Sequence, residues 1–230
     1  MVQTSRTLQI ELPPPFPANF LDYVTDAALS LPQTSATVEL THALAAVGYR
    51  YRAMHDAQRM LQGSLAVTVR GRTPEEKFVQ DSHLMHFLTD GLSSIEALAF
   101  SAYLCGHLTN APRFPIHAGA LAKVTPMSVE KLFRRTLPQA GLTASLRRLC
   151  RAREFEEWKS MRTTLTHRSQ PALQPHHLLV SKVAELDETW LRRKRGWLDD
   201  QILVLLRELL SFMGKEVQVQ HAQPVHVLVN

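Results

Sequence analysis

Residues 73–108 decide the fold, and they read TPEEKFVQDSHLMHFLTDGLSSIEALAFSAYLCGHL. Thr73 is a typical helix cap, Pro74 suits a first helical turn, and the two glutamates that follow complement the positive end of the helix dipole. Apolar residues then recur at helical spacing, at Phe78, Leu84, Phe87, Leu88, Leu92, Ile95, Leu98, Ala99 and Ala102. The stretch therefore predicts one long amphipathic helix that ends before the loop at 110–115.

Helical periodicity continues on both sides of this stretch. The pattern predicts further helices at about 37–61, 128–137, 140–150 and 151–167, and a last helix that begins at Ser181 or Leu186 and ends at Phe212. No internal repeat or low-complexity tract interrupts the chain. We therefore predict an all-α fold, a bundle of about four long helices with shorter helices between them.

The two ends of the chain show a different pattern. Residues 7–12 alternate weakly in polarity, and four prolines between Pro13 and Pro17 disfavour a helix, so residues 1–35 are predicted to be an extended segment and linker. Residues 216–220 also alternate, which predicts an extended tail over 215–230. These ends are candidates for a small β-pair, and residues 36–214 form the predicted helical domain.

Composition limits the class of protein. The chain has 230 residues, 45% of them hydrophobic, which is enough for a core. Its 2 cysteines exclude a disulfide scaffold and favour a reducing compartment, so a cytoplasmic location is expected. Neither a signal-peptide pattern nor a long uncharged apolar run occurs, and phosphate-loop and serine-hydrolase motifs are absent. No membrane association and no cofactor are predicted.

The positive charge is unevenly distributed. The formal net charge of the chain is +5, but residues 131–168 hold ten basic residues against three glutamates, a local charge of about +7. Such a segment attracts polyanions. A second basic run, Arg192–Arg195, is followed by Asp199, Asp200 and Glu208, and we interpret it as a solvated helix face.

The basic segment contains an arginine and a histidine near the end of a predicted helix, Arg162 and His167. Five residues turn an ideal helix through about 140° net, so the arginine must lean toward the histidine for the two to act together. A fixed cation that binds phosphate would then lie beside an imidazole whose ordinary pKa allows proton transfer. Such a pair can promote attack of an RNA 2′-hydroxyl without a metal.

Arg162 to His167 resembles the Arg-x4-6-His motif of HEPN domains, on a late helix of an α-helical bundle with Trp158 ahead of it. The resemblance covers about residues 37–212, and the segment 90–98 resembles the other core helix of the family, with Glu96 facing the motif. It implies RNA binding, a homodimer and metal-independent endoribonuclease activity. It also implies an antitoxin or other protein partner in a defence system.

The resemblance also implies roles for individual residues. His167 would be the general base or acid, and Arg162 would bind the scissile phosphate. Thr163, where active relatives commonly have Asn, Asp or His, would orient either residue, as would Thr166, and Glu96 would orient the arginine. Four further arginines would bind the RNA backbone: Arg147, Arg148, Arg151 and Arg168.

A second interpretation of the same residues needs no catalysis. Arg162 would pair with Glu157 or Glu96, and His167 would stabilise a helix end as a cation. The protein would then be a non-catalytic interaction or dimerisation module that binds nucleic acid or an acidic partner. Three nearby aromatic residues are predicted to lie in the core rather than stack on bases: Phe133, Phe155 and Trp158.

Two pairs of potential metal ligands, each containing histidine, have spacings that occur in metal sites. His83 and His86 share a helix face, and Glu39 and His42 match half of a di-iron pattern. No second Glu-x-x-His occurs in the sequence. We therefore predict no metal site.

Overall fold

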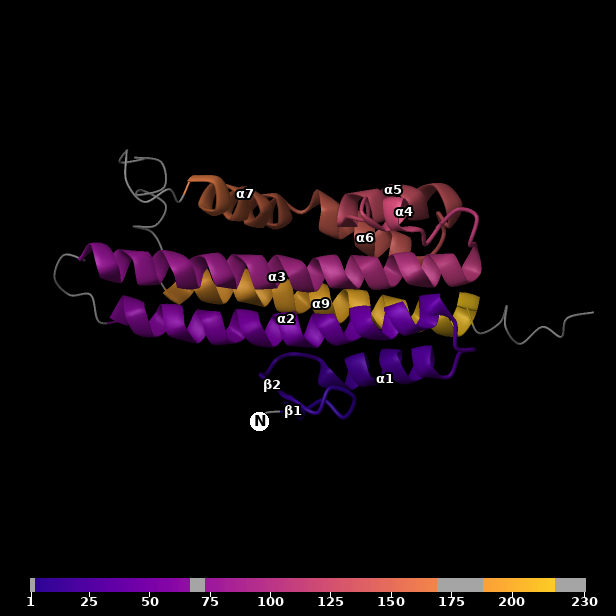
Figure 1. Cartoon of the computed structure of the whole chain (residues 1–230), viewed down its shortest axis with the longest axis horizontal. Coiled ribbons are helices and arrows are strands. Elements are labelled where there is room, and N and C mark those ends of the chain that lie inside the picture. The colour runs from indigo at the N-terminus through magenta and orange to yellow at the C-terminus, as the bar shows by residue number, and fades with distance from the viewer. Residues whose placement is uncertain (1–2, 67–72, 169–187, 218–230) are drawn as a thin grey trace, which may run out of the picture.

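A computed structural model describes residues 3–66, 73–168 and 188–217. Most of these residues are helical, and the helices are arranged in three layers (Figure 1). The middle layer holds three long helices: α2 (Ser35–Ala66), α3 (Pro74–Thr109) and α9 (Glu188–Phe212). The N-terminal elements lie on one side of it, and α4 to α7 lie on the other. The predicted all-α fold is confirmed.

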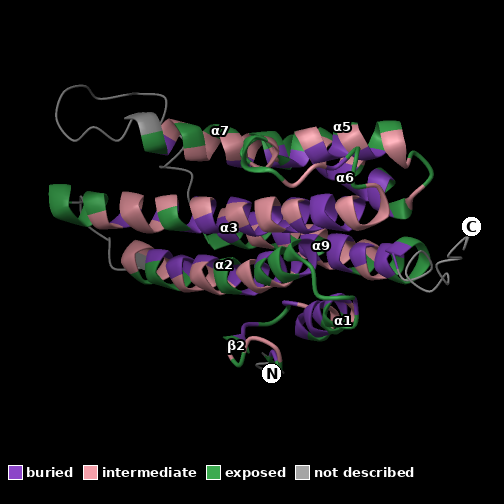
Figure 2. Ribbon diagram, turned by 45° about the vertical axis from the view of Figure 1, so that its right-hand side comes forward, coloured by how far each residue is buried: buried purple, intermediate pink, exposed green. Residues whose placement is uncertain are grey.

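Helix α3 begins and ends almost where its caps predict. The Thr73 hydroxyl accepts a hydrogen bond from the Glu76 backbone N–H at 3.2 Å, and the Glu76 carboxylate accepts one from the Thr73 backbone N–H at 2.8 Å. This reciprocal box satisfies two N–H groups that a helix start would leave unpaired. Because α2, α7 and α9 all pack against it, α3 buries side chains on several faces (Figure 2).

Helix α9 completes the middle layer and runs beside α2 and α3 (Figure 1). Its buried residues recur every three or four positions, as the periodicity predicts, and include Leu191, Leu198, Ile202, Leu205 and Leu209. The extended tail predicted from residue 215 is wrong at its start. Residues 213–217 form a π-helical turn, η1, whose Met213 and Val217 are buried because they continue the apolar face of α9. Residues 218–230 lie outside the described part.

The third layer consists of four shorter helices: α4 (Ala118–Leu121), α5 (Pro126–Thr136), α6 (Gly141–Arg151) and α7 (Arg153–Arg168). Thr125 caps α5 by accepting from the Ser128 backbone N–H at 3.2 Å, with Pro126 in the first turn. Pro138 lies in the connection of residues 137–140 that separates α5 from α6. The helices predicted at about 128–137, 140–150 and 151–167 are therefore confirmed.

The N-terminal segment contains a helix that is not predicted from the sequence, because prolines precede it. The prediction of an extended segment and linker over 1–35 is wrong for α1 (Ala18–Leu29), which begins directly after Pro17. Proline disfavours a helix interior but is compatible with the residues that open one. The apolar spacing of Leu21, Val24 and Ala28 gives α1 one buried face.

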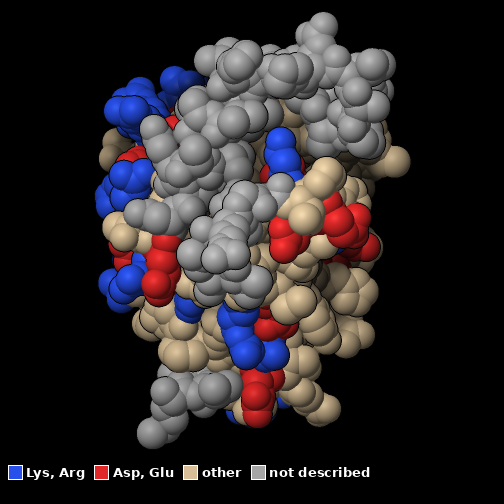
Figure 3. Space-filling view, turned by 90° about the vertical axis from the view of Figure 1, so that its left-hand side faces the viewer, with Lys and Arg blue, Asp and Glu red and all other residues tan. Residues whose placement is uncertain are grey.

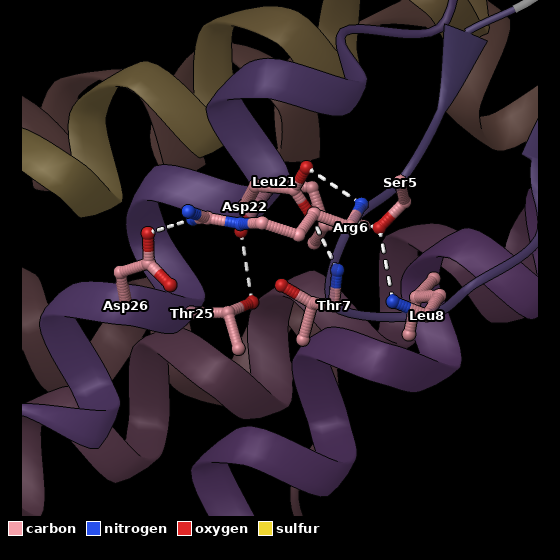
Figure 4. A network of polar contacts seen from close by, with 8 residues as sticks. All are labelled: Ser5, Arg6, Thr7, Leu8, Leu21, Asp22, Thr25 and Asp26. Carbon is pink, nitrogen blue, oxygen red and sulfur yellow. Dashed lines mark hydrogen bonds and ion pairs between the residues drawn. The ribbon is translucent and has the colours of Figure 1, made fainter.

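Ahead of α1, two short strands pair within the N-terminal segment. β1 (Gln3–Thr4) and β2 (Glu11–Leu12) are antiparallel. The loop between them binds α1 at Asp22, whose carboxylate accepts from the Ser5 hydroxyl at 2.7 Å and the Arg6 backbone N–H at 3.1 Å (Figure 4). Burial opposes ionisation of Asp22, but these hydrogen bonds outweigh it and hold the pKa of the carboxyl below its ordinary value.

Among the described residues, every helix is too short or too polar to cross a bilayer.

Candidate nucleic-acid interface

Helix α7 carries three of the predicted catalytic residues, Arg162, Thr163 and His167, and packs tightly on α3 at Trp158. The Trp158 ring is fully buried over Gly91, where a Cβ would lie 2.5 Å from Cζ3 of the ring. Phe87 packs on the same indole with ring centroids 5.1 Å apart. Phe133 and Phe155 are buried too, so the prediction that these aromatic residues belong to the core is confirmed.

Arg162 contacts Glu96, one of the two carboxylates that the sequence offers as its partner. The Arg162 guanidinium donates from Nη1 to Oε1 of Glu96 at 3.0 Å, and the two side chains are 31% and 42% exposed. An ion pair this exposed stabilises the fold by about 1 kcal/mol or less. The contact orients the guanidinium while leaving it within reach of a phosphate from solution. It is equally the pairing that the non-catalytic interpretation predicts.

The other predicted catalytic residues lie on the same helix as Arg162. Thr163 is exposed on α7. The Thr166 hydroxyl donates to the Arg162 backbone carbonyl at 2.8 Å, so its hydrogen bond is made within α7 and not to the Arg162 side chain. His167 and Arg168 belong to the last turn of α7, but their side chains lie outside the described part. The proximity of Arg162 and His167 therefore stays a prediction.

The alternative pairing of Arg162 with Glu157 is not formed. Glu157 accepts instead from the Lys194 ammonium and from Nε of Arg153, the latter at 2.9 Å. The hydrogen bond from Lys194 is the main reason that the pKa of Glu157 lies below its ordinary value. Of the two carboxylates proposed for Arg162, only Glu96 contacts it.

A broad cationic surface lies on α5 and α6. From Ala97 through Arg153 the sequence contains nine basic residues but a single acidic one, Glu130. Glu130 is buried, and its Oε1 lies 3.1 Å from Nε of Arg134 on α5 and 3.6 Å from Nε of Arg147 on α6. The shared carboxylate therefore draws together the cationic sides of the two helices and is itself screened from solvent.

The cations of this surface follow one stripe on each helix. We call the set the α5–α6 cationic face: Lys131, Arg134, Arg135, Arg147, Arg148 and Arg151. Spacings of three and four residues place Lys131 and Arg135 on one side of α5, and Arg148 and Arg151 on one side of α6. These four side chains are exposed and form no ion pair with any described residue. Their charges are therefore available to an external anion.

A different arrangement of charge joins α9 to its neighbours, where the sequence predicts only a solvated basic run. We call it the α9 polar seam: Tyr51, Glu157, Lys194, Arg195 and Asp199. The Lys194 side chain is 2% exposed and pairs with Glu157, and Nε of Arg195 lies 3.6 Å from Oδ2 of Asp199. The prediction of a solvated face is wrong at Lys194, which reaches inward between α7 and α9.

The centre of the seam is a buried hydroxyl and carboxylate. The Tyr51 hydroxyl donates to Oδ1 of Asp199 at 2.6 Å, and the Tyr51 ring packs on Phe16 with centroids 4.6 Å apart. Burial raises the pKa of Asp199 to about 6, against the opposing effects of Tyr51 and Arg195. The sequence gives one indication of this cluster: Tyr51 lies on a predicted core face, and a buried tyrosine hydroxyl needs a hydrogen-bond partner.

The histidine pairs form no metal centre within the described ranges. Neither His83 with His86 nor Glu39 with His42 joins a group of three potential ligands in the parts of the chain that the structure covers. His42 and His86 are exposed, as expected for polar positions on long amphipathic helices.

Comparison with known proteins gives no relative from which a function could be transferred. No protein family, curated protein or solved structure matches the chain. The site must therefore be interpreted from its own residues.

Proposed function

We propose that the protein binds RNA through the α5–α6 cationic face. One observation carries the proposal: four exposed cations have no anionic partner among the described residues, while Glu130, the only carboxylate that α5 and α6 contain, is buried between two arginines. Keeping unneutralised like charges close together is unfavourable unless an external anion compensates them. A phosphate backbone supplies such charges at regular spacing.

The test is RNA binding as a function of salt. Fluorescence anisotropy with a labelled RNA mixture should give affinity that falls steeply between about 50 and 200 mM salt. Arg148→Gln with Arg151→Gln removes two of the four free cations, so it should weaken binding about tenfold or more and flatten its salt dependence. The matched control, Arg59→Gln with Lys77→Gln, removes two exposed cations from other helices and should bind like the unmodified protein. Unchanged binding by the Arg148/Arg151 variant would refute the assignment.

A second candidate function is metal-independent RNA cleavage by Arg162 and His167. It is favoured by the Glu96 contact, which orients a partly exposed guanidinium on the same helix as the histidine. In this mechanism the 2′-oxygen attacks the phosphorus that Arg162 binds, and His167 accepts the proton of the 2′-hydroxyl. The bond from phosphorus to the 5′-oxygen breaks, the leaving 5′-oxygen takes up a proton, and a cyclic phosphate remains. The HEPN resemblance points to the same pair. The non-catalytic alternative predicts binding without turnover.

Cleavage of mixed RNA in EDTA separates these two functions. His167→Ala and Arg162→Ala, each with helicity verified by circular dichroism, should abolish cleavage but keep most of the binding. Glu96→Gln should reduce cleavage less than either, because it only positions the arginine. Absence of cleavage by the intact protein across substrates at low salt would leave the binding function alone.

The homodimer and the antitoxin partner implied by the HEPN resemblance belong to this proposal. A dimer would bring two α7 motifs into one cleft and double the number of cations that contact a single RNA. Sedimentation equilibrium of the intact chain tests this directly, and a monomer at micromolar concentration would remove the cleft from the mechanism.

A further inference from the structure

We infer that the α5–α6 cationic face binds the sugar–phosphate backbone of a nucleic-acid duplex rather than the bases of a single strand. This inference rests on the proposed function and names the form of nucleic acid that the site takes. It draws on three features of the face: where its aromatic residues lie, how its cations are spaced, and which part of α6 is accessible.

The aromatic residues of the face are all turned inward. Proteins that bind single strands without sequence preference combine a basic groove with exposed aromatic rings on which bases stack. Here the one aromatic residue of α5, Phe133, is fully buried, and those of α7, Phe155 and Trp158, are at most 2% exposed. Helix α6 has no aromatic residue. A nucleic acid on this face therefore meets charges and not stacking surfaces.

The size of the face suits a duplex backbone. Helices α5 and α6 have 11 residues each, and so each is about 16 Å long. A duplex carries one phosphate per about 1.7 Å of its axis, or about nine over this length, and about half of them can face the protein. The four cations that form no ion pair with a described residue match that number, whereas Arg134 and Arg147 are already paired with Glu130. The positions of these cations are fixed because both helices are anchored by buried side chains, such as Phe133 on α5 and Leu149 on α6.

The first turn of α6 does not favour insertion into a groove. A Cβ on Gly141, the first residue of the helix, would collide with the Glu208 carboxylate, so this turn lies against α9. The carboxylate would also repel phosphate there. The exposed cations instead lie further along the helix, at Arg148 and Arg151. The face therefore contacts the backbone with the sides of its helices, which carries charge recognition but no base readout.

The salt dependence of binding measures this arrangement. If the four free cations each contact one phosphate, the slope of log K against log salt should be about −3.6 for a duplex and about −2.8 for a single strand. Between about 50 and 200 mM salt these slopes correspond to losses of about 150-fold and about 50-fold in affinity. For a probe of known form, the slope therefore reports the number of phosphate contacts.

The experiment compares three labelled probes by anisotropy: an RNA duplex of about 20 base pairs, one of its strands with a sequence that does not fold, and a DNA duplex. We expect the RNA duplex to bind at least about fivefold more tightly than the strand at about 100 mM salt, with the steeper slope. Equal binding of the DNA duplex supports the inference because the backbone is then the recognised group, and weaker binding assigns the site to RNA geometry.

Lys131→Gln with Arg148→Gln removes one free cation from each helix. It should halve the duplex slope to about −1.8 and weaken duplex binding by about tenfold or more. The control pair Arg59→Gln and Lys77→Gln should leave the slope unchanged. A strand that binds as tightly as the duplex would overturn this inference but keep the proposed function, whereas no binding of any probe would overturn both.

Discussion

The α5–α6 cationic face and the α9 polar seam contain the same residue types in opposite arrangements. On the face, four cations point to solvent and the only carboxylate is buried between two further arginines. In the seam, Lys194 is buried and paired with Glu157, and Asp199 lies under Tyr51. Figure 3 shows a third pattern at the end of the molecule where α7 ends, with Lys, Arg, Asp and Glu interspersed.

The buried, paired charges of the α9 polar seam stabilise the fold, whereas the exposed cations of the α5–α6 cationic face are available to bind an anion. A buried ion pair whose partner is removed leaves an unsatisfied charge, so its loss costs stability. Exposed cations contribute little to stability and are available for binding. The comparison therefore predicts large stability effects in the seam and binding effects without stability effects on the face.

Lys194→Ala should have the largest effect on stability. It leaves Glu157 without its main partner and empties space packed by the lysine chain beside Trp190, so we expect a loss of about 3 kcal/mol, near the low end for buried pairs because Glu157 is partly exposed. Urea unfolding followed by circular dichroism measures it. The double variant Lys194→Met with Glu157→Gln removes both charges and should recover most of the loss, and a single-variant loss below about 1 kcal/mol would contradict the seam's role.

Asp199→Asn should change how stability depends on pH. The folded-state pKa of Asp199, about 6, lies above the ordinary value of 3.8, so the native state binds more protons between these values. The unmodified protein should therefore lose stability as pH rises from about 4 to about 6, by at most about 3 kcal/mol. Asp199→Asn should lack this loss. Glu39→Gln on α2 supplies the control, because Glu39 is exposed and is not among the groups that shift the pKa of Asp199, so this variant should keep the original profile.

The carboxyl of Glu157 should give the opposite pH dependence within the same seam. Its folded-state pKa is lowered, chiefly by Lys194, so its stabilising effect is present above its ordinary pKa and is lost as pH falls through the folded value. Glu157→Gln should therefore be less stable than the unmodified protein near pH 7 and approach it at about pH 3. A constant difference across this range would show that the ion pair does not form in solution.

Gly91→Ala should destabilise the contact of α7 with α3 by about 2 kcal/mol, because the new methyl group meets the rigid, buried Trp158 ring. Gly196→Ala is the matched control in α9, where nothing lies within 4 Å of an added methyl group and alanine is the better helix former. It should stabilise the protein by about 0.5–1 kcal/mol. Thermal unfolding of both variants tests the pair.

Arg148→Gln should have the smallest effect on stability, within about 0.5 kcal/mol of the unmodified protein. Its side chain is exposed and forms no ion pair with described residues. Chemical denaturation is the measurement, run beside the RNA-binding assay on the same preparation. If Arg148→Gln unfolds as easily as Lys194→Ala, then the cationic face is structural and the comparison fails.

Much of the fold can be predicted because its signals are local. The Thr73 capping box and the apolar spacing after it place α3 within one residue of its observed start. The contact of Glu96 with Arg162 is one of two alternatives, and the other, with Glu157, is not formed. Helix α1 is not predicted because the four prolines directly before it favour an extended segment. The last of them, Pro17, stands at the position where a helix can begin.

Local signals in the sequence establish where most of the helices lie and where positive charge is concentrated, because caps, periodicity and composition act over a few neighbouring residues. Which charges are buried depends on the tertiary structure. Lys194 meets Glu157 across 37 residues and Tyr51 meets Asp199 across 148, so their partners come from distant segments. A run of basic residues has the same composition whether it lies on an exposed binding face or in a buried seam. Burial by the neighbouring helices, which removes water from the charges, is what distinguishes the two.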